Sequence, residues 1–160
     1  MSGFLFLTLA FFNFLELGEC LLEYKSSVTD YCLEDNYFTL SEVNRNSSFF
    51  NPYYKYCDQS GFGYTSPDWK GPNWYRFVQP AGFKIPESPV KSYYCGTNAS
   101  GWLNGKHPEN FGDVIEQKAC FHFYDNECWY SIAIQIMNCG DFYVYYLPQT
   151  PYCYMRYCAE

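Results

Sequence analysis

Cysteine is the residue type in this chain whose number and spacing most clearly predict chemistry. The nine cysteines are Cys20, Cys32, Cys57, Cys95, Cys120, Cys128, Cys139, Cys153 and Cys158. Thiols in such numbers either pair as disulfides in an oxidising compartment or ligate a metal ion. An odd number would leave one reactive thiol in a secreted protein. Loss of Cys20 with a cleaved leader would leave eight cysteines, which is enough for four disulfides.

The spacing of the cysteines does not favour a zinc site. Structural zinc usually takes two ligands from one C-x₂₋₄-C pair and two more from a second such pair of Cys or His. Cys153 and Cys158 have four residues between them, but no second pair matches, and Cys120 is only two positions from His122. The sequence therefore predicts disulfides, with no metal and no cofactor.

Catalytic chemistry has little support in the sequence. The two histidines are His107, which precedes Pro108, and His122, which alternates with aromatic residues. A hydrolase triad needs a nucleophile, a base and an acid held in one geometry, but no Gly-x-Ser-x-Gly turn occurs and every mature cysteine is expected to be oxidised. Carboxylates that folding could bring together are Glu109, Asp113, Glu116, Asp125 and Glu127. Such residues more often lie on a solvated surface, so we predict that the protein is not an enzyme.

A group of aromatic residues is the candidate binding surface, namely Tyr53, Tyr54, Tyr56 and Trp69, with Trp74 nearby. Such rings could form a stacking platform for sugars or an interface hot spot. The alternative is that they pack beneath the disulfides, which is the commoner use of aromatic side chains.

Two N-x-S/T sequons predict glycosylation, at Asn46 and Asn98. Both lie in loop-like surroundings, as an acceptor in a secreted protein should. The alternative for each is a chance match to a short pattern.

The first twenty residues read as a secretory signal peptide. Residues 4–17 form an almost unbroken apolar run, which is shorter than the about 20 residues that a membrane span needs. Gly18 and Cys20 supply the small residues that signal peptidase prefers, so the cut is expected after Cys20. A buried helix is the alternative, but the run has no polar face. No other segment is long enough to span a membrane, and no anchor is expected.

The mature chain has the size of one domain and an acidic balance. Removal of residues 1–20 takes away Glu16 and Glu19, so the formal charge changes from −7 to −5. An acidic chain does not favour nucleic acid or anionic membrane surfaces as partners. The 18 Tyr, 15 Phe and 4 Trp favour strands over helices.

Residues 21–73 predict an irregular N-terminal arm rich in Gly, Pro and Asn, and residues 74–160 predict a strand-rich core. We expect strands over 74–78, 119–124, 131–137, 142–147 and 152–157. The Gly140-Asp141 turn predicts a hairpin between the third and fourth of these. Helical periodicity is weak, and only 111–118 could hold one or two helical turns. The fold class is thus a mainly β, small disulfide-rich extracellular domain with little helix.

Several ordered motifs resemble one known family. They are Trp74-Tyr75-Arg76-Phe77, Trp102-Leu103-Asn104-Gly105 with His107-Pro108, Gly112-Asp113, Ala119-Cys120, Phe142-Tyr143-Val144-Tyr145 and Arg156-Tyr157-Cys158, with Cys32, Asn36-Tyr37 and Cys57-Asp58 in the arm. This set resembles the cysteine-rich decoy-module domain of the uromodulin family, which includes zymogen-granule glycoprotein 2 and the oncoprotein-induced transcript 3 protein. The resemblance covers about 130 residues.

The resemblance also implies a disulfide pairing. The fullest form of the family has two more cysteines, at the positions where this chain has Pro89 and Glu127. Their joint absence suggests that they are partners in the family. The remaining eight would then pair as Cys32–Cys139, Cys57–Cys153, Cys95–Cys158 and Cys120–Cys128.

In uromodulin and its pancreatic relative, glycans on this region act as decoy receptors for bacterial adhesins. The family's sequon at Asn104 is broken here by Lys106. We therefore expect a secreted, non-catalytic domain that binds an extracellular protein or glycan, or presents its own glycans. The alternative is a structural component of extracellular matrix or mucus.

Overall fold

Strands dominate the computed structural model, which describes residues 30–160. The expected signal peptide and Cys20 lie outside the described residues. The strands are β1 (Phe38–Leu40), β2 (Asn73–Phe77), β3 (Ala99–Asn104), β4 (Val114–Phe123), β5 (Asn126–Asn138), β6 (Tyr143–Leu147) and β7 (Met155–Tyr157). Three single 3₁₀ turns, η1 (Asp30–Cys32), η2 (Glu34–Asn36) and η3 (Val43–Arg45), are the helical elements of the described part. The predicted mainly β fold is confirmed.

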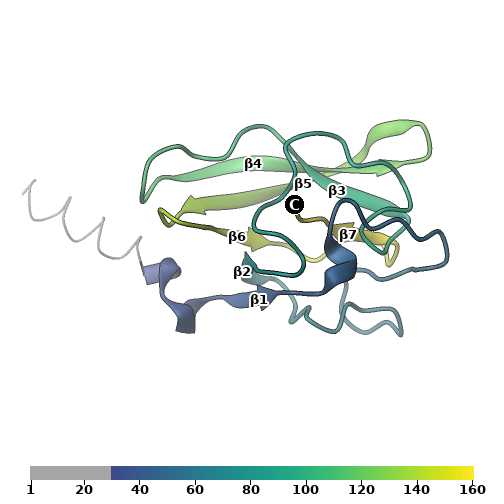
Figure 1. Cartoon of the computed structure of the whole chain (residues 1–160), viewed down its shortest axis with the longest axis horizontal. Helices are drawn as coiled ribbons and strands as arrows, with labels where there is room; N and C mark the ends of the chain where they lie inside the picture. The colour runs from purple at the N-terminus through teal and green to yellow at the C-terminus, as the bar shows by residue number, and fades with distance from the viewer. Residues whose placement is uncertain (1–29) are drawn as a thin grey trace, which may run out of the picture.

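The seven strands form one sheet in the order β1-β2-β6-β5-β4-β3-β7 (Figure 1). β4 and β5 are the longest strands and pair along most of their length, from Val114 opposite Met137 to Phe123 opposite Asn126. The edge strands β1 and β7 pair in parallel with their neighbours, whereas the inner pairs are antiparallel. Strands far apart in the sequence therefore become neighbours.

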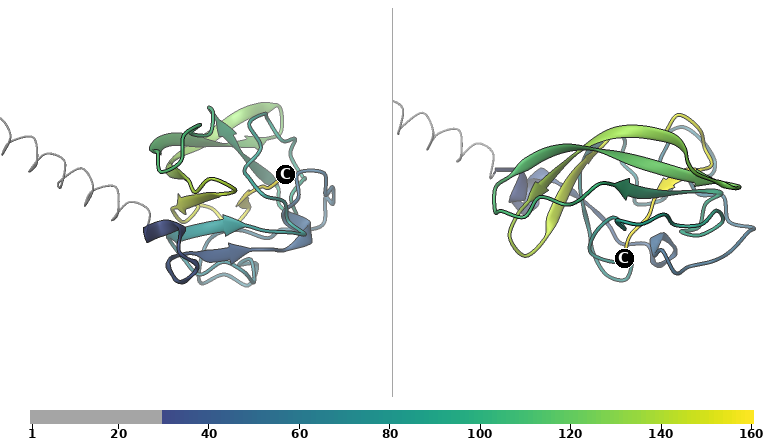
Figure 2. Two further views of the ribbon diagram at one scale, coloured as in Figure 1. Left: turned by 60° about the vertical axis from the view of Figure 1, so that its left-hand side comes forward. Right: turned by 90° about the horizontal axis from the view of Figure 1, so that it is seen from above.

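The sheet curls around a single main core, so that its two edges approach one another (Figure 2). All seven strands contribute to this core, from Leu40 on β1 to Tyr157 on β7. Just beyond these strands, Asn46 and Ala159 form a parallel bridge, and the Ala159 amide donates to the Arg45 carbonyl at 2.9 Å. The segment after β1 thus pairs with the residue that follows Cys158, just beyond β7.

The hairpin expected around Gly140 and Asp141 is confirmed, because β5 and β6 pair antiparallel from Asn138 opposite Tyr143. The alternating isoleucines also behave as expected, since Ile134 and Ile136 are fully buried in the main core. The expectation of helical turns in 111–118 is wrong. Residues from Val114 onward belong to β4, because pairing with β5 satisfies their backbone groups and overrides a weak local preference.

Four disulfides tie the described chain together, and they are the pairs that the resemblance implies. They join Cys32 to Cys139, Cys57 to Cys153, Cys95 to Cys158 and Cys120 to Cys128. The first two connect the 21–73 arm to strands or loops of the 74–160 core. Closing loops of 107 and 96 residues restricts the unfolded chain strongly and so stabilises the folded one.

Candidate functional site

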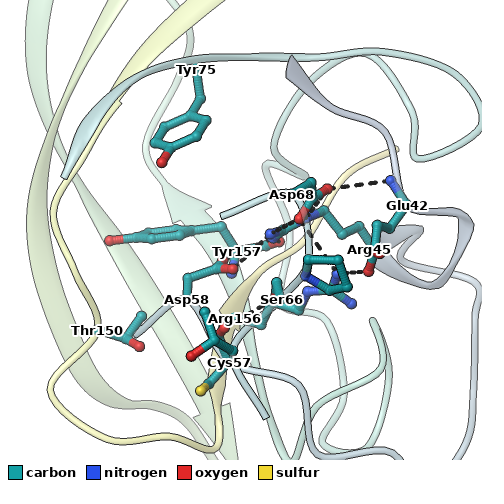
Figure 3. Close-up of polar contacts among 12 residues, drawn as sticks. Glu42, Arg45, Cys57, Asp58, Ser66, Asp68, Tyr75, Thr150, Arg156 and Tyr157 are labelled. Carbon is teal, nitrogen blue, oxygen red and sulfur yellow. Dashed lines mark hydrogen bonds and ion pairs between the residues drawn. The ribbon is translucent and has the colours of Figure 1, made fainter. Parts of the chain in front are cut away.

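A buried ion-pair network centred on Arg45 holds the arm against β7 (Figure 3). Arg45, at the end of η3, is fully buried and donates to both Asp58 oxygens at 2.6 and 2.8 Å. Its guanidinium also donates to Asp68 at 2.6 Å and to the Tyr157 carbonyl at 3.2 Å. Asp58 in turn accepts the Tyr157 amide at 3.0 Å.

A second buried arginine extends this network. Arg156 on β7 donates to Glu42 at 2.8 Å, to Asn44 at 2.7 Å and to the Cys95 carbonyl at 3.1 Å. Burial, followed by the nearby charge of Arg45, lowers the pKa of Arg156 to about 10. Although burial opposes it, Asp58 and Asp68 raise the pKa of Arg45 further above its ordinary value, so Arg45 stays charged. The bonds of this network are all internal, so its role is structural.

A smaller polar cluster surrounds His107. Its two ring nitrogens lie 2.7 Å from Glu87 Oε1 and 2.8 Å from the Tyr145 hydroxyl. Hydrogen bonds from Lys106 and then from His107 lower the pKa of Glu87 to about 2. Burial lowers the pKa of His107, although Glu87 opposes it. Burial also raises the pKa of Tyr145 well above its ordinary value, and the Tyr145 side chain is fully buried.

The other histidine borders an open hollow of about 390 Å³. His122 Nε2 lies 3.0 Å from the Tyr124 carbonyl, and its Nδ1 has no partner in the described chain. Lys91, Ser92, Tyr124, Asp125 and Glu127 form the rest of the lining. Among residues 30–160, no group of three or more His, Cys, Asp and Glu side chains has the geometry to hold a metal ion.

The aromatic residues predicted as a binding surface divide into two groups. Tyr53, Tyr54 and Tyr56 line one open hollow of about 380 Å³, together with Tyr64. The prediction that Trp69 belongs to this surface is wrong, because only 4% of it is exposed. It stacks on Tyr75 at 4.9 Å, inside the main core. The large Trp69 ring gains more free energy by burial in the core than it would by lying on the surface.

Trp74 follows the alternative interpretation of packing beneath a bridge. It is buried in a cluster that includes Met137, and the Cys32–Cys139 bridge packs against this cluster.

A second group of rings, which the sequence did not single out, gathers where β4 turns into β5. We call it the aromatic face, and its members are Phe123, Tyr124, Trp129, Tyr130, Tyr152 and Tyr154. Tyr152 and Tyr154 stack at 5.5 Å with planes 8° apart, and Tyr154 also stacks on Phe123 at 5.5 Å. Tyr124 is 66% exposed and Tyr152 is 45% exposed. The density of aromatic residues around 123–130 was the available signal, but the contribution of 152–154 depends on the fold.

Tyr124 occupies a backbone conformation that is costly for a residue with a side chain. It has φ of +52° in the two-residue turn between Phe123 and Asn126, which pair with each other. The left-handed region costs a non-glycine residue roughly 1–2 kcal/mol. Glycine would avoid this cost, so the exposed ring is kept at the expense of stability.

The two sequons lie in different surroundings. The Asn46 side chain donates to the Ala81 carbonyl at 2.9 Å and accepts the Ser48 amide at 3.0 Å. Asn98 is half-buried beside the aromatic face. It lines a hollow of about 270 Å³ with Phe123 and Tyr154, and the remaining lining residues are Lys55, Tyr64 and Cys153.

The comparison with protein families decides between the interpretations of the motifs. The sequence model of the uromodulin-like cysteine-rich domain matches residues 75–159, which is more than half of the chain. The chain belongs to the uromodulin-like domain family. The match begins inside β2 and ends just after β7, so it contains six of the seven strands in whole or in part.

Curated relatives support the same family. This uromodulin-like chain is 42% identical over 88 residues to "Pancreatic secretory granule membrane major glycoprotein GP2" of Canis lupus familiaris, covering 54% of this chain and 17% of the relative. It is 35% identical over 125 residues to "Uromodulin" of Rattus norvegicus, covering 78% of this chain and 18% of the relative. The glycoprotein GP2 of Mus musculus is 31% identical over 129 residues, with 78% and 22% covered. The chain thus spans about a fifth of the length of the curated relatives that it matches.

The segments around Pro89 and Glu127, where the resemblance implies two further cysteines in the family, both contact Trp102 in this uromodulin-like domain. Trp102 Nε1 donates to the Glu127 carbonyl at 2.7 Å. Trp102 also packs in one cluster with Val90, the residue after Pro89, and with Cys120. Contacts through Trp102 therefore join the two segments.

Among the described residues, no helix is long and apolar enough to cross a membrane.

Proposed function

We propose that this uromodulin-like domain is a secreted, non-catalytic recognition module whose aromatic face binds an extracellular protein. The observation that carries the proposal is the gathering of six aromatic rings at one end of the sheet, four of them well exposed. Exposed clusters of Tyr and Trp are enriched at protein interfaces, where they supply most of the binding energy.

The arrangement of the rings favours a protein over a sugar at this face. Tyr154 lies between Tyr152 and Phe123 in a stack, so both of its flat faces are covered. A sugar ring would need a free flat face, because its C–H groups are attracted to the negative face and not to the positive edge of an aromatic ring. Rings that stack on one another in this way therefore suit a protein surface better than a sugar ring.

The backbone at Tyr124 supports a binding role independently. A strained residue at an exposed turn is tolerated where function depends on it, and the inference runs from the observed strain to the function. Tyr124 lies in the exposed turn at the tip of the β4–β5 hairpin, and its ring centroid is 4.4 Å from that of Phe123. It would therefore be among the first side chains to meet a partner.

Secretion is part of the same proposal. Four disulfides form and persist in oxidising compartments, and residues 4–17 are an apolar stretch of the kind found in secretory leaders. The relatives named as a secretory granule membrane glycoprotein are consistent with this route. We infer that the domain acts outside the cell.

A binding screen with matched variants tests the proposal. The secreted domain, fused to a dimerising tag, is applied to an array of purified ectodomains and secreted proteins and to a glycan array of oligomannose and sialylated sugars. The variants are Trp129→Ala, Tyr124→Gly and, as a matched control, Phe83→Ala, which removes a ring that is 61% exposed outside the aromatic face. Tyr124→Gly is the sharpest variant, because it should raise stability while it lowers affinity.

We expect at least one ectodomain whose binding falls tenfold or more in Trp129→Ala and Tyr124→Gly but not in Phe83→Ala. Loss of a hot-spot ring typically costs about 2 kcal/mol or more, which is roughly 30-fold in affinity. Ectodomains that bind all variants equally would overturn the proposal. Binding to the glycan array alone would also overturn it, and would favour a sugar site in the hollow beside Tyr53.

A further inference from the structure

We propose that an N-linked glycan on Asn98 packs its first sugar into the hollow beside the aromatic face, against the exposed ring of Tyr64. The hollow is the one of about 270 Å³ lined by Lys55, Tyr64, Asn98, Phe123, Cys153 and Tyr154. Its occupant would be the N-acetylglucosamine that is bonded to Asn98. The proposal rests on secretion, because the chain meets the glycosylation machinery only on that route.

The backbone fixes Asn98 at the rim of this hollow. The Asn98 carbonyl accepts the Tyr93 amide at 3.1 Å, and the next amide, of Ala99, donates to the Tyr154 carbonyl at 2.8 Å. Bonds on both sides therefore hold the attachment point beside Tyr154. A sugar on the Asn98 side chain would enter the hollow without any rearrangement of the main chain.

The side chain of Asn98 is free to carry the sugar. It lines the hollow, in contrast to the Asn46 side chain, which donates to the Ala81 carbonyl. Ser100 of the sequon is fully buried, and its hydroxyl donates to the carbonyls of Lys91 and Tyr94. The glycosylation enzyme must therefore act on this sequon before β3 folds.

The modification is a transfer from a lipid-linked oligosaccharide diphosphate. The Asn98 Nδ2 nitrogen forms a bond with the anomeric carbon of the first sugar, and the bond from that carbon to the diphosphate oxygen breaks. Nδ2 gives up one proton, and the lipid diphosphate leaves with the bonding electrons. The side chain keeps one N–H and its carbonyl oxygen.

Tyr64 is the ring best suited to meet the sugar. It is 58% exposed, and among residues 30–160 no other aromatic ring lies within pairing distance of it. Its ring is therefore more open to a sugar than the half-buried rings of Phe123 and Tyr154, which stack on one another. The negative face of a tyrosine attracts the polarised C–H groups of a sugar ring. Lys55, which also lines the hollow, can donate to a sugar oxygen.

The test compares three forms of the protein secreted from animal cells grown so that their glycans stay oligomannose. The first carries the whole glycan, the second carries one N-acetylglucosamine after endoglycosidase treatment, and the third is Asn98→Gln. Mutation at Ser100 is avoided because its hydroxyl is part of the fold. Each form is made with Tyr64 intact, with Tyr64→Ala and with Phe83→Ala as the matched exposed-ring control.

Mass spectrometry should find Asn98 occupied, and the first two forms should unfold at the same temperature. Asn98→Gln should unfold about 3 °C lower, the shift expected when a domain of this size loses one favourable ring contact. In Tyr64→Ala this difference should vanish, and in Phe83→Ala it should persist. The N-acetyl methyl resonance of the single-sugar form should move upfield on folding, through the ring current of Tyr64, but not in Tyr64→Ala.

An unmodified Asn98 in the secreted protein overturns the inference, as does a thermal difference that is unchanged by Tyr64→Ala. Failure of the proposed function looks different. In that case the binding screen would find no partner whose binding depends on Trp129, either for the wild type or for Asn98→Gln. The glycan result at Asn98 would be unaffected. A chain that stays in the cell, with free thiols, would overturn both.

Discussion

Replacement of Arg45 by methionine should destabilise this domain more than any substitution of an exposed charge. Methionine has a similar length and no charge, so the change removes the guanidinium but leaves the space filled. Asp58 would then keep the Tyr157 amide as its donor at 3.0 Å and lose two bonds from Arg45. Both residues are fully buried, so water cannot replace what is lost.

The expected cost is about 3–5 kcal/mol, the usual penalty when one partner of a buried ion pair is removed and the other charge stays buried. A domain of this size has a net stability of about 5–15 kcal/mol, so the loss is a large fraction of the whole. Lys84→Met is the matched control, since Lys84 and Glu160 form an ion pair whose two side chains are each 41% exposed. Its loss should cost at most about 1 kcal/mol.

Urea unfolding with the disulfides intact gives the measurement. Tryptophan fluorescence reports it, because Trp69, Trp74 and Trp102 are buried in the folded state. The double variant Arg45→Met/Asp58→Asn provides a further check, because removal of both charges should cost less than the sum of the single changes. A cost below about 1 kcal/mol for Arg45→Met, or strict additivity in the double variant, would refute the view that a desolvated charge pair holds the arm to β7.

Three further predictions concern other parts of the fold. Glu87→Gln should cost about 1 kcal/mol of stability at neutral pH, after allowance for solvent screening, and nothing near pH 2. The folded pKa of Glu87, about 2, lies below the ordinary 4.5, so the ionised carboxylate stabilises the fold above pH 4.5 and this stabilisation is lost as the pH falls to 2. Unfolding measurements across this pH range will show the difference. Pro89→Cys/Glu127→Cys should form a fifth disulfide, because Trp102 joins the two segments. The intact mass should fall by about 2 Da for the new bridge, and two free thiols would contradict the prediction. Replacement of Cys120 and Cys128 by serine should cost about 2.5 kcal/mol, roughly half of the value for the 107-residue loop, and an equal cost in urea unfolding would argue against loop entropy as the cause.

Much of the fold could be predicted from local patterns. Alternation at Ile132, Ile134 and Ile136, and the turn at Gly140 and Asp141, predict the β5–β6 hairpin because they depend on residues close in the sequence. The same reasoning fails at Val114 to Lys118, where pairing with β5 decides the conformation. The short strands β1 and β3 were not expected, because neither has a pattern of its own and each exists only through its neighbours.

The candidate site follows the same division. Tyr53, Tyr54 and Tyr56 were singled out by their density in the sequence, and they do line one hollow. Trp69 looked equivalent, yet its ring is in the core because the chain after it enters β2 and brings it against Tyr75. The density of a residue type cannot say which rings face inward.

The sequence by itself determined the chemistry available to this protein. Its cysteines are spaced for disulfides and match no zinc site, its aromatic residues favour strands over helices, and its motifs are those of the uromodulin-like family. Only the tertiary structure decided where that chemistry is displayed. Phe123 and Tyr154 are thirty-one positions apart, and Asn98 is remote from both, yet the curl of the sheet puts all three around one hollow. Contacts between distant residues depend on how the whole sheet closes, and no local pattern contains that information.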